Sequence, residues 1–135
     1  FTQTEWQPDL LNSPKLKRFA YINEEFKEKA GQEMTGIPAD CYSSTWVLYY
    51  GIEKAGSLDP DKIREALASI VIDLPSEEVN VILPYEKIDL TKDGQNPYTA
   101  ICVAQIINGE FKIVWPSEYA TIDAVWPAPS WEERG

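Results

Sequence analysis

The chain has 135 residues, a formal charge of −10 and 44% hydrophobic residues, which fits one acidic globular unit spanning residues 1–135. An acidic chain repels the phosphate backbone, so no nucleic-acid partner is expected. Histidine is absent, and Cys41 and Cys102 lie far apart in the sequence, which argues against Ser-His-Asp or Cys-His catalysis, zinc sites and a Cys-x-x-Cys redox pair. We therefore expect no cofactor, no metal and no catalytic residue.

The first twelve residues are polar and predict irregular structure, with Trp6 and Pro8 as the strong features. Ser13-Pro14 then predicts a helix start, with serine as N-cap and proline at the first helical position. Apolar residues recur at helical spacing up to Gly31, which suits a helix C-terminus. These residues are Leu16, Phe19, Ala20, Ile22 and Phe26.

Two more helices are predicted before the middle of the chain. One runs from about Pro38-Ala39 to Gly56 and is apolar around most of its circumference, so we expect it to be buried at the centre of the core. The next begins at Asp59-Pro60, again a capping residue followed by proline. Its expected inward face is Ile63, Ala66, Leu67 and Ile70.

The second half of the chain predicts strands. A short strand is expected near Val79 to Leu83, and Asn108-Gly109 predicts a type I′ hairpin between Tyr98–Ile107 and Glu110–Trp115. One face of that hairpin is expected to carry Cys102, Ala104, Ile106, Phe111, Ile113 and Trp115. The tail from Pro116 predicts an extended strap held down by Trp126 and Trp131.

Residues that could carry chemistry mostly favour ordinary structural roles. The pairs Glu24-Glu25, Glu77-Glu78 and Glu132-Glu133 sit in polar surroundings and predict solvated surface. Ser43-Ser44-Thr45 has no nearby base, and Asp89, Asp93 and Asn96 around Gly94 fit a turn better than a calcium loop. Among the many aromatic residues, Trp46, Tyr49 and Trp115 suit inward faces. Trp6 and Tyr42 lie in a loop and at a helix start, where ligand-contacting side chains collect.

The order of motifs resembles a known family. Thr4-Glu5-Trp6 precedes a helix ending at Gly31, Cys41-Tyr42-Ser43-Ser44 opens a helix that closes at Lys54-Ala55-Gly56-Ser57, and Ile63 to Leu67 follow. The turn ending in Gly94-Gln95-Asn96, the Asn108-Gly109 hairpin, Val114-Trp115-Pro116 and Pro127-Ala128-Pro129-Ser130-Trp131 complete the series. This series is similar to the C-terminal part of type I periplasmic substrate-binding proteins of ABC transporters, the branched-chain amino acid and amide group.

The resemblance implies an α/β fold that, when complete, is a three-layer, two-lobed α/β/α protein closing around a ligand by hinge motion. Here it implies three helices followed by short strands and a hairpin, with further binding residues upstream of Phe1. It implies a periplasmic or extracellular protein, with a lipid anchor at the missing N-terminus as one option, that binds an amino-acid-like or amide ligand and delivers it to ABC permease subunits. Trp6 and Tyr42 are the implied ligand-binding residues. The alternative is a sensory ligand-binding domain of a signalling receptor with the same fold.

Two further expectations follow from the predicted elements. The apolar faces of the first two helices exceed what the short strands can cover, so we expect the chain to self-associate or to pair with a missing N-terminal part. Cys41 opens a helix that is expected to be buried, and Cys102 faces inward on a strand. We therefore expect two unpaired, buried thiols.

Overall fold

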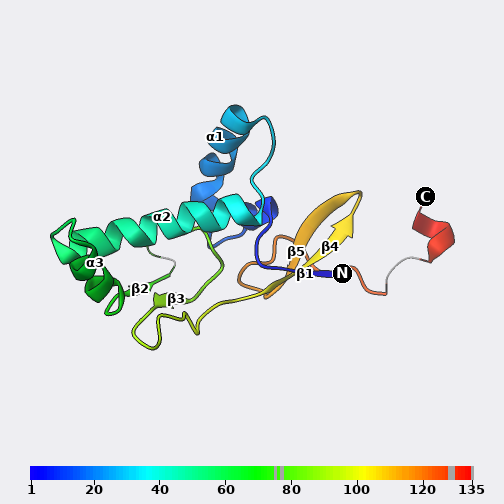
Figure 1. Cartoon of the computed structure of the whole chain (residues 1–135). Coiled ribbons are helices and arrows are strands. Elements are labelled where there is room, and N and C mark those ends of the chain that lie inside the picture. Colours follow the sequence, from blue (N-terminus) through cyan, green and yellow to red (C-terminus); the bar gives the residue numbers. More distant parts are fainter. Residues whose placement is uncertain (75, 77, 128–129, 135) are drawn as a thin grey trace.

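A computed structural model describes residues 1–74, 76, 78–127 and 130–134 as a mixed α/β chain. Its α-helices are α1 (Ala20–Ala30), α2 (Gly36–Ala55) and α3 (Pro60–Leu67), and its strands form two small antiparallel sheets. The long helix α2 crosses the molecule, with α3 and the strands β2 (Val71–Asp73) and β3 (Lys87–Asp89) at one end (Figure 1). The other sheet lies beyond the opposite end of α2. The predicted α/β class is confirmed at this level.

Helix α1 begins later than the sequence predicts. Ser13 does not cap it, because its hydroxyl accepts a hydrogen bond from the Leu16 amide (3.3 Å) within a tight turn. Two 3₁₀ turns, η1 (Pro8–Asn12) and η2 (Lys17–Phe19), occupy most of the preceding segment. The predicted end is confirmed, since Gly31 adopts a left-handed φ of 72° that closes the helix.

Helices α2 and α3 start and end close to their predicted limits. Gly56 closes α2 with a φ of 58°, and the Asp59 carboxylate caps α3 by accepting hydrogen bonds from the amides of Asp61 and Lys62. Ala66 and Ile70 lie on the buried side of this region, as predicted. Within the described residues, no helix is both long and apolar enough to cross a bilayer.

The predicted burial of α2 is wrong. Its buried positions are Ala39, Ser43 and Gly51, which lie on one side of the helix. On the outward side Leu48 is 46% exposed, and Ile37 and Tyr49 are exposed as well. Leu48 borders a recess against α3 and Leu90, but no element among the described residues packs over Ile37 and Tyr49, so α2 is buried on one side only although its sequence is apolar on more than one stripe.

The larger sheet joins the first residues of the chain to the late hairpin. Strands β1 (Thr2–Thr4), β4 (Cys102–Ile107) and β5 (Glu110–Trp115) lie in the order β1-β4-β5, and all pairs are antiparallel. Asn108 and Gly109 have φ values of 52° and 81°, so the predicted hairpin with both turn residues at positive φ is confirmed. Strand β1 replaces the irregular structure predicted there. It is an edge strand whose stability comes from pairing with β4, which no local signal reveals.

A β-bulge changes the predicted face of the hairpin. Ala104 pairs with Ile113, but the next residue back, Val103, pairs with Trp115, so Val114 is an extra residue on β5. Trp115 therefore lies on the face of Val103, opposite to its predicted face, and is 57% exposed. Ile106 and Phe111 keep their predicted pairing but are also exposed, because the hairpin tip extends past the core.

The predicted strand near Val79 to Leu83 is irregular in the structure. Val81, Ile82 and Leu83 are nevertheless buried and form the centre of the core. The Ser43 hydroxyl on α2 accepts a hydrogen bond from the Ile82 amide (3.3 Å), which satisfies a buried donor without a strand partner. Side-chain hydrogen bonding thus replaces the expected ladder.

The C-terminal strap is held by different groups from those predicted. Trp126 and Trp131 are 78% and 82% exposed. The strap instead buries Tyr119, and Val125 exchanges two hydrogen bonds with the Gln105 side chain (2.9 and 3.1 Å). Trp126 keeps one ring contact, with Phe1 at 6.4 Å between centroids.

The two cysteines are free but differ in environment. Cys102 is buried, whereas Cys41 is exposed because it lies on the uncovered side of α2. The predicted burial of Cys41 is therefore wrong. Burial raises the pKa of the Cys102 thiol to about 11, and the nearby charge of Glu118 adds to the effect. Cys102 thus holds almost no thiolate near neutral pH.

We expect iodoacetamide at pH 8 to alkylate Cys41 and to spare Cys102 in the folded chain. The physical reason is that the reagent must reach the sulfur, and only Cys41 is exposed, while burial also raises the pKa of the Cys102 thiol to about 11. Intact-mass spectrometry should show one adduct under native conditions and two in denaturant. Two adducts forming at equal rates in the native protein would contradict this assignment.

Candidate functional site

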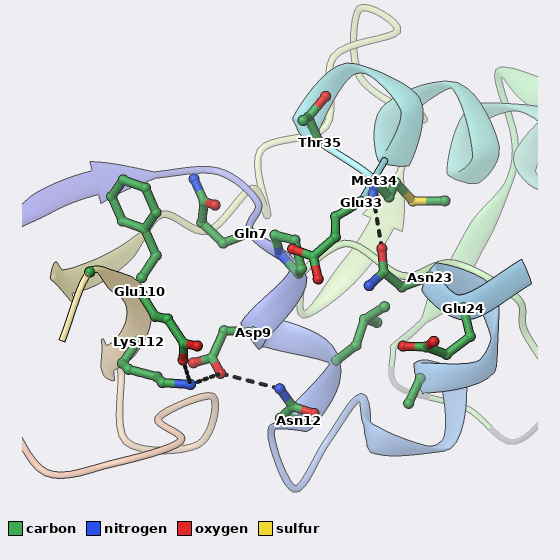
Figure 2. Close-up of a pocket in the computed structure, with 15 residues that line it drawn as sticks. Gln7, Asp9, Asn12, Asn23, Glu24, Glu33, Met34, Thr35, Glu110 and Lys112 are labelled. Atoms are coloured by element: carbon green, nitrogen blue, oxygen red, sulfur yellow. Dashed lines mark hydrogen bonds and ion pairs between the residues drawn. The ribbon is translucent and has the colours of Figure 1, made fainter. Parts of the chain in front are cut away.

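A polar pocket of about 530 Å³ opens between η1, the start of α1, the loop that precedes α2 and the tip of the β4–β5 hairpin (Figure 2). We call it the polar pocket. Its volume lies in the range of roughly 300–1,000 Å³ typical of small-molecule sites. Its polar lining consists of Gln7, Asp9, Asn12, Asn23, Glu24, Glu33, Thr35, Glu110 and Lys112, and Met34 and Phe111 are among its apolar lining residues.

Asp9 connects the wall of this pocket to the sheet. One carboxylate oxygen accepts hydrogen bonds from the Ile113 amide (2.8 Å) and the Thr121 hydroxyl, and the other accepts one from the Asn12 amide group (3.2 Å). The side chain is buried, and the Lys112 ammonium lies 3.7 Å from it. A single buried carboxylate therefore binds η1, the edge of β5 and the strap together.

Lys112 is shared by two carboxylates. Its ammonium lies 2.9 Å from Glu110 and 3.7 Å from Asp9. The hydrogen bond to Glu110, followed by the charge of Asp9, raises the pKa of Lys112. The group stays cationic near neutral pH, and these three residues together still carry a net negative charge.

Asn23 is the least expected residue in the pocket lining. It lies on α1 between Phe19 and Phe26 in the apolar stripe, yet it is a polar residue and only 8% exposed. Its side-chain oxygen accepts a hydrogen bond from the Met34 amide (2.9 Å), which fixes the loop that follows α1. An asparagine at a core-facing position of the predicted helix is the only sequence signal that points to this site.

Trp6 lies in the core rather than at a surface. It is 2% exposed, and its indole N–H donates a hydrogen bond to the backbone oxygen of Ile82 (3.3 Å). In this arrangement the ring has no open face and its polar atom already has a partner. Its contribution here is to tie the loop after β1 to the central buried segment.

Tyr42 lies in the second turn of α2, half-buried against the core. Burial raises the pKa of its hydroxyl. Its ring meets Trp46 edge-on with centroids 6.5 Å apart, and Trp46 contacts Tyr49 (5.5 Å) and Tyr50 (5.9 Å). We call these four residues the α2 aromatic cluster. Trp6 and Tyr42 thus differ, since only Tyr42 keeps part of its surface open.

A second recess of about 480 Å³ lies between α2 and the segment from Leu83 to Thr99. Its lining is mainly apolar and includes Val47, Leu67 and Ile88. Asp40 stands in its wall, where burial first and the charge of Glu5 second raise the pKa of its carboxyl. The two predicted ligand residues do not line this recess or the polar pocket.

The remaining candidate residues have structural positions. Glu24, Glu25, Glu78 and Glu132 are exposed, while Glu77 and the side chain of Glu133 lie outside the described residues. Asp89 accepts hydrogen bonds from the amide and hydroxyl of Thr91, and Asn96 bridges back to Asp89 and Lys87, so this segment is a tied turn. No three metal-ligating side chains converge anywhere in the described part of the chain.

The geometry supports binding by hydrogen bonds and ion pairs. A scan against protein-family models finds none that matches the chain.

We expect Asp9→Asn to destabilise the fold by about 1–3 kcal/mol, because an amide nitrogen would face hydrogen-bond donors and the charge opposite Lys112 would be lost. Urea unfolding should show a lower midpoint at an unchanged slope. The matched control is Glu110→Gln, which removes an exposed carboxylate from the same lysine and should change stability by less than about 0.5 kcal/mol. Equal effects of the two substitutions would disprove the central role of Asp9.

Proposed function

We propose that the chain is part of an extracytoplasmic solute-binding protein of the type I periplasmic class, which binds an amino-acid-like or amide ligand and delivers it to an ABC permease. The proposal rests on the order of motifs and on where they lie in the fold. Cys41-Tyr42-Ser43-Ser44 lies in the first half of α2, Gly56 closes that helix, and Asp59-Pro60 caps the next. The protein acts by binding and catalyses no reaction.

The observation that carries the proposal is the half-open position of Tyr42. Its ring is packed on one side by Trp46 and the core, which fixes its orientation, and part of its surface remains exposed. An aromatic ring held in this way offers a flat wall with a polar tip, which small-molecule sites commonly use. The rest of the cleft is supplied by the part of the protein that covers α2.

The uncovered side of α2 supports such a partner. Ile37, Leu48 and Tyr49 expose apolar surface along one side of a helix whose other side is packed. Soluble proteins rarely leave such a stripe open to water. In the proposed function this surface packs against the N-terminal part of the same protein, and in its absence against a second copy of the chain.

The alternative, a sensory ligand-binding domain of a signalling receptor, would use the same cleft. The two functions differ in what receives the closed, ligand-bound form: a permease or a signalling segment. The motif order resembles the binding proteins of transporters, so transport is the function we propose.

We expect Tyr42→Ala in the full-length protein to weaken ligand binding roughly tenfold or more, because an interface aromatic in a ligand site is a frequent hot spot. The ligand is first identified by a thermal-shift screen of amino acids and their amides, and affinity is then measured by calorimetry. Tyr21→Ala is the control and should leave the affinity unchanged, because it removes a tyrosine that is 52% exposed and lies on α1, outside the α2 aromatic cluster. Unchanged affinity together with a collapsed melting temperature would mean that Tyr42 is only a core residue.

We expect the isolated 135-residue chain to associate, with a mass in light scattering above its 15.3 kDa. The interface should bury more than about 1,000 Å² in total, the size of a specific contact. Ile37→Glu places a charge in the uncovered stripe, where Ile37 is 77% exposed, and should shift the chain toward monomer, whereas Leu58→Glu, at an 81% exposed position after α2, should not. A wild-type monomer with a cooperative melt would contradict the proposed partner surface.

A further inference from the structure

The strap that follows the hairpin has two parts that differ in how they are held. Its first part is fixed, because Tyr119 is 3% exposed and Thr121 donates its amide to the Ile113 carbonyl (2.8 Å) and its hydroxyl to Asp9. Residues 122–127, which we call the strap end, are all exposed. The boundary between the two parts lies directly after Thr121.

The strap end is held to the sheet by one side chain. Gln105 lies on the central strand β4 and is only 7% exposed. Its amide group donates to the Val125 carbonyl (3.1 Å) and accepts from the Val125 amide (2.9 Å). No other hydrogen bond joins residues 122–127 to the rest of the described chain. The ring contact of Trp126 with Phe1 joins two exposed side chains.

Release of the strap end requires little free energy with these contacts. Water can replace both hydrogen-bond partners of Gln105 once the strap end leaves, so little net hydrogen-bond energy is lost. The strap end also exposes no buried apolar side chain of its own, since Ile122, Val125 and Trp126 are already 37%, 42% and 78% exposed. Segments with few buried apolar contacts open with the smallest free energies in a native protein.

We propose that the strap end opens as one unit, with a hinge directly after Thr121, while the sheet and the first part of the strap stay folded. Opening uncovers the amide group of Gln105 in the middle of the sheet, so the strap end acts as a lid over this position. The hinge lies there because the bond from Thr121 to Asp9 holds the chain on one side of it only. The inference does not depend on the proposed function, since it uses only contacts within this chain.

Amide hydrogen exchange, measured residue by residue by NMR, tests the lid, because the Val125 and Thr121 amides are both hydrogen-bonded in the closed state. We expect the Val125 amide to exchange at least about tenfold faster than the amides of Thr121 and Ile113, after correction for intrinsic rates. Low concentrations of urea should change the Val125 rate little and accelerate exchange at Ile113, because a local opening exposes little surface. Equal protection of the three amides, or equal urea dependence, would overturn the proposal.

Gln105→Ala removes the hydrogen bonds that hold the lid, and Gln3→Ala on β1 is the matched control because Gln3 is an exposed glutamine of the same sheet. We expect Gln105→Ala to raise the Val125 exchange rate to that of an unstructured chain and to leave Thr121 and Ile113 within about twofold of the wild type. Gln3→Ala should change none of the three rates. Loss of protection at Ile113 in Gln105→Ala would show that the strap end and the sheet unfold together, and would overturn the lid. The urea series on the wild-type chain decides the question if the variant does not fold.

Discussion

One end of the molecule depends on the hydrogen bonds that the Asp9 carboxylate accepts. Ile113 lies at the outer edge of β5, where its amide and carbonyl have no strand partner. Asp9 accepts from the amide, and the backbone of Thr121 donates to the carbonyl (2.8 Å). The edge is thereby closed by a side chain and a strap, which removes the exposed ladder that edge strands otherwise present.

The same contact shapes the polar pocket. Because Asp9 is fixed to β5, η1 lies beside the hairpin tip, and the start of α1 follows close behind. Lys112 enters the pocket wall already neutralised by Asp9 and Glu110. The stability of the sheet edge and the charge of the pocket therefore have one origin, so substitutions of Asp9 affect both.

Helix α2 gives the molecule two chemically different sides. Its packed side carries Ser43, whose hydroxyl satisfies the buried Ile82 amide, and Tyr50, whose hydroxyl accepts from the Asn80 amide (2.9 Å). Its outward side carries Ile37 and Cys41, which are exposed and have no covering layer among the described residues. In the proposed function, the packed side of α2 forms part of the core of this unit, and its outward side contacts the remainder of the protein.

The sequence alone determined the features that depend on neighbouring residues: the left-handed helix ends at glycine, the Asp59 cap and the Asn108-Gly109 turn. The tertiary structure decided the features that depend on distant contacts. These are the pairing of β1 with β4, the exposed side of α2, the β-bulge that places Trp115 on the face of the hairpin opposite to the predicted one, and the polar pocket. Asn23 and Asp9 are separated in sequence from most of their neighbours in space, so only the folded chain shows that they line one cavity. Local backbone preferences act over a few residues, whereas burial and pairing are settled by whichever distant segment packs against them.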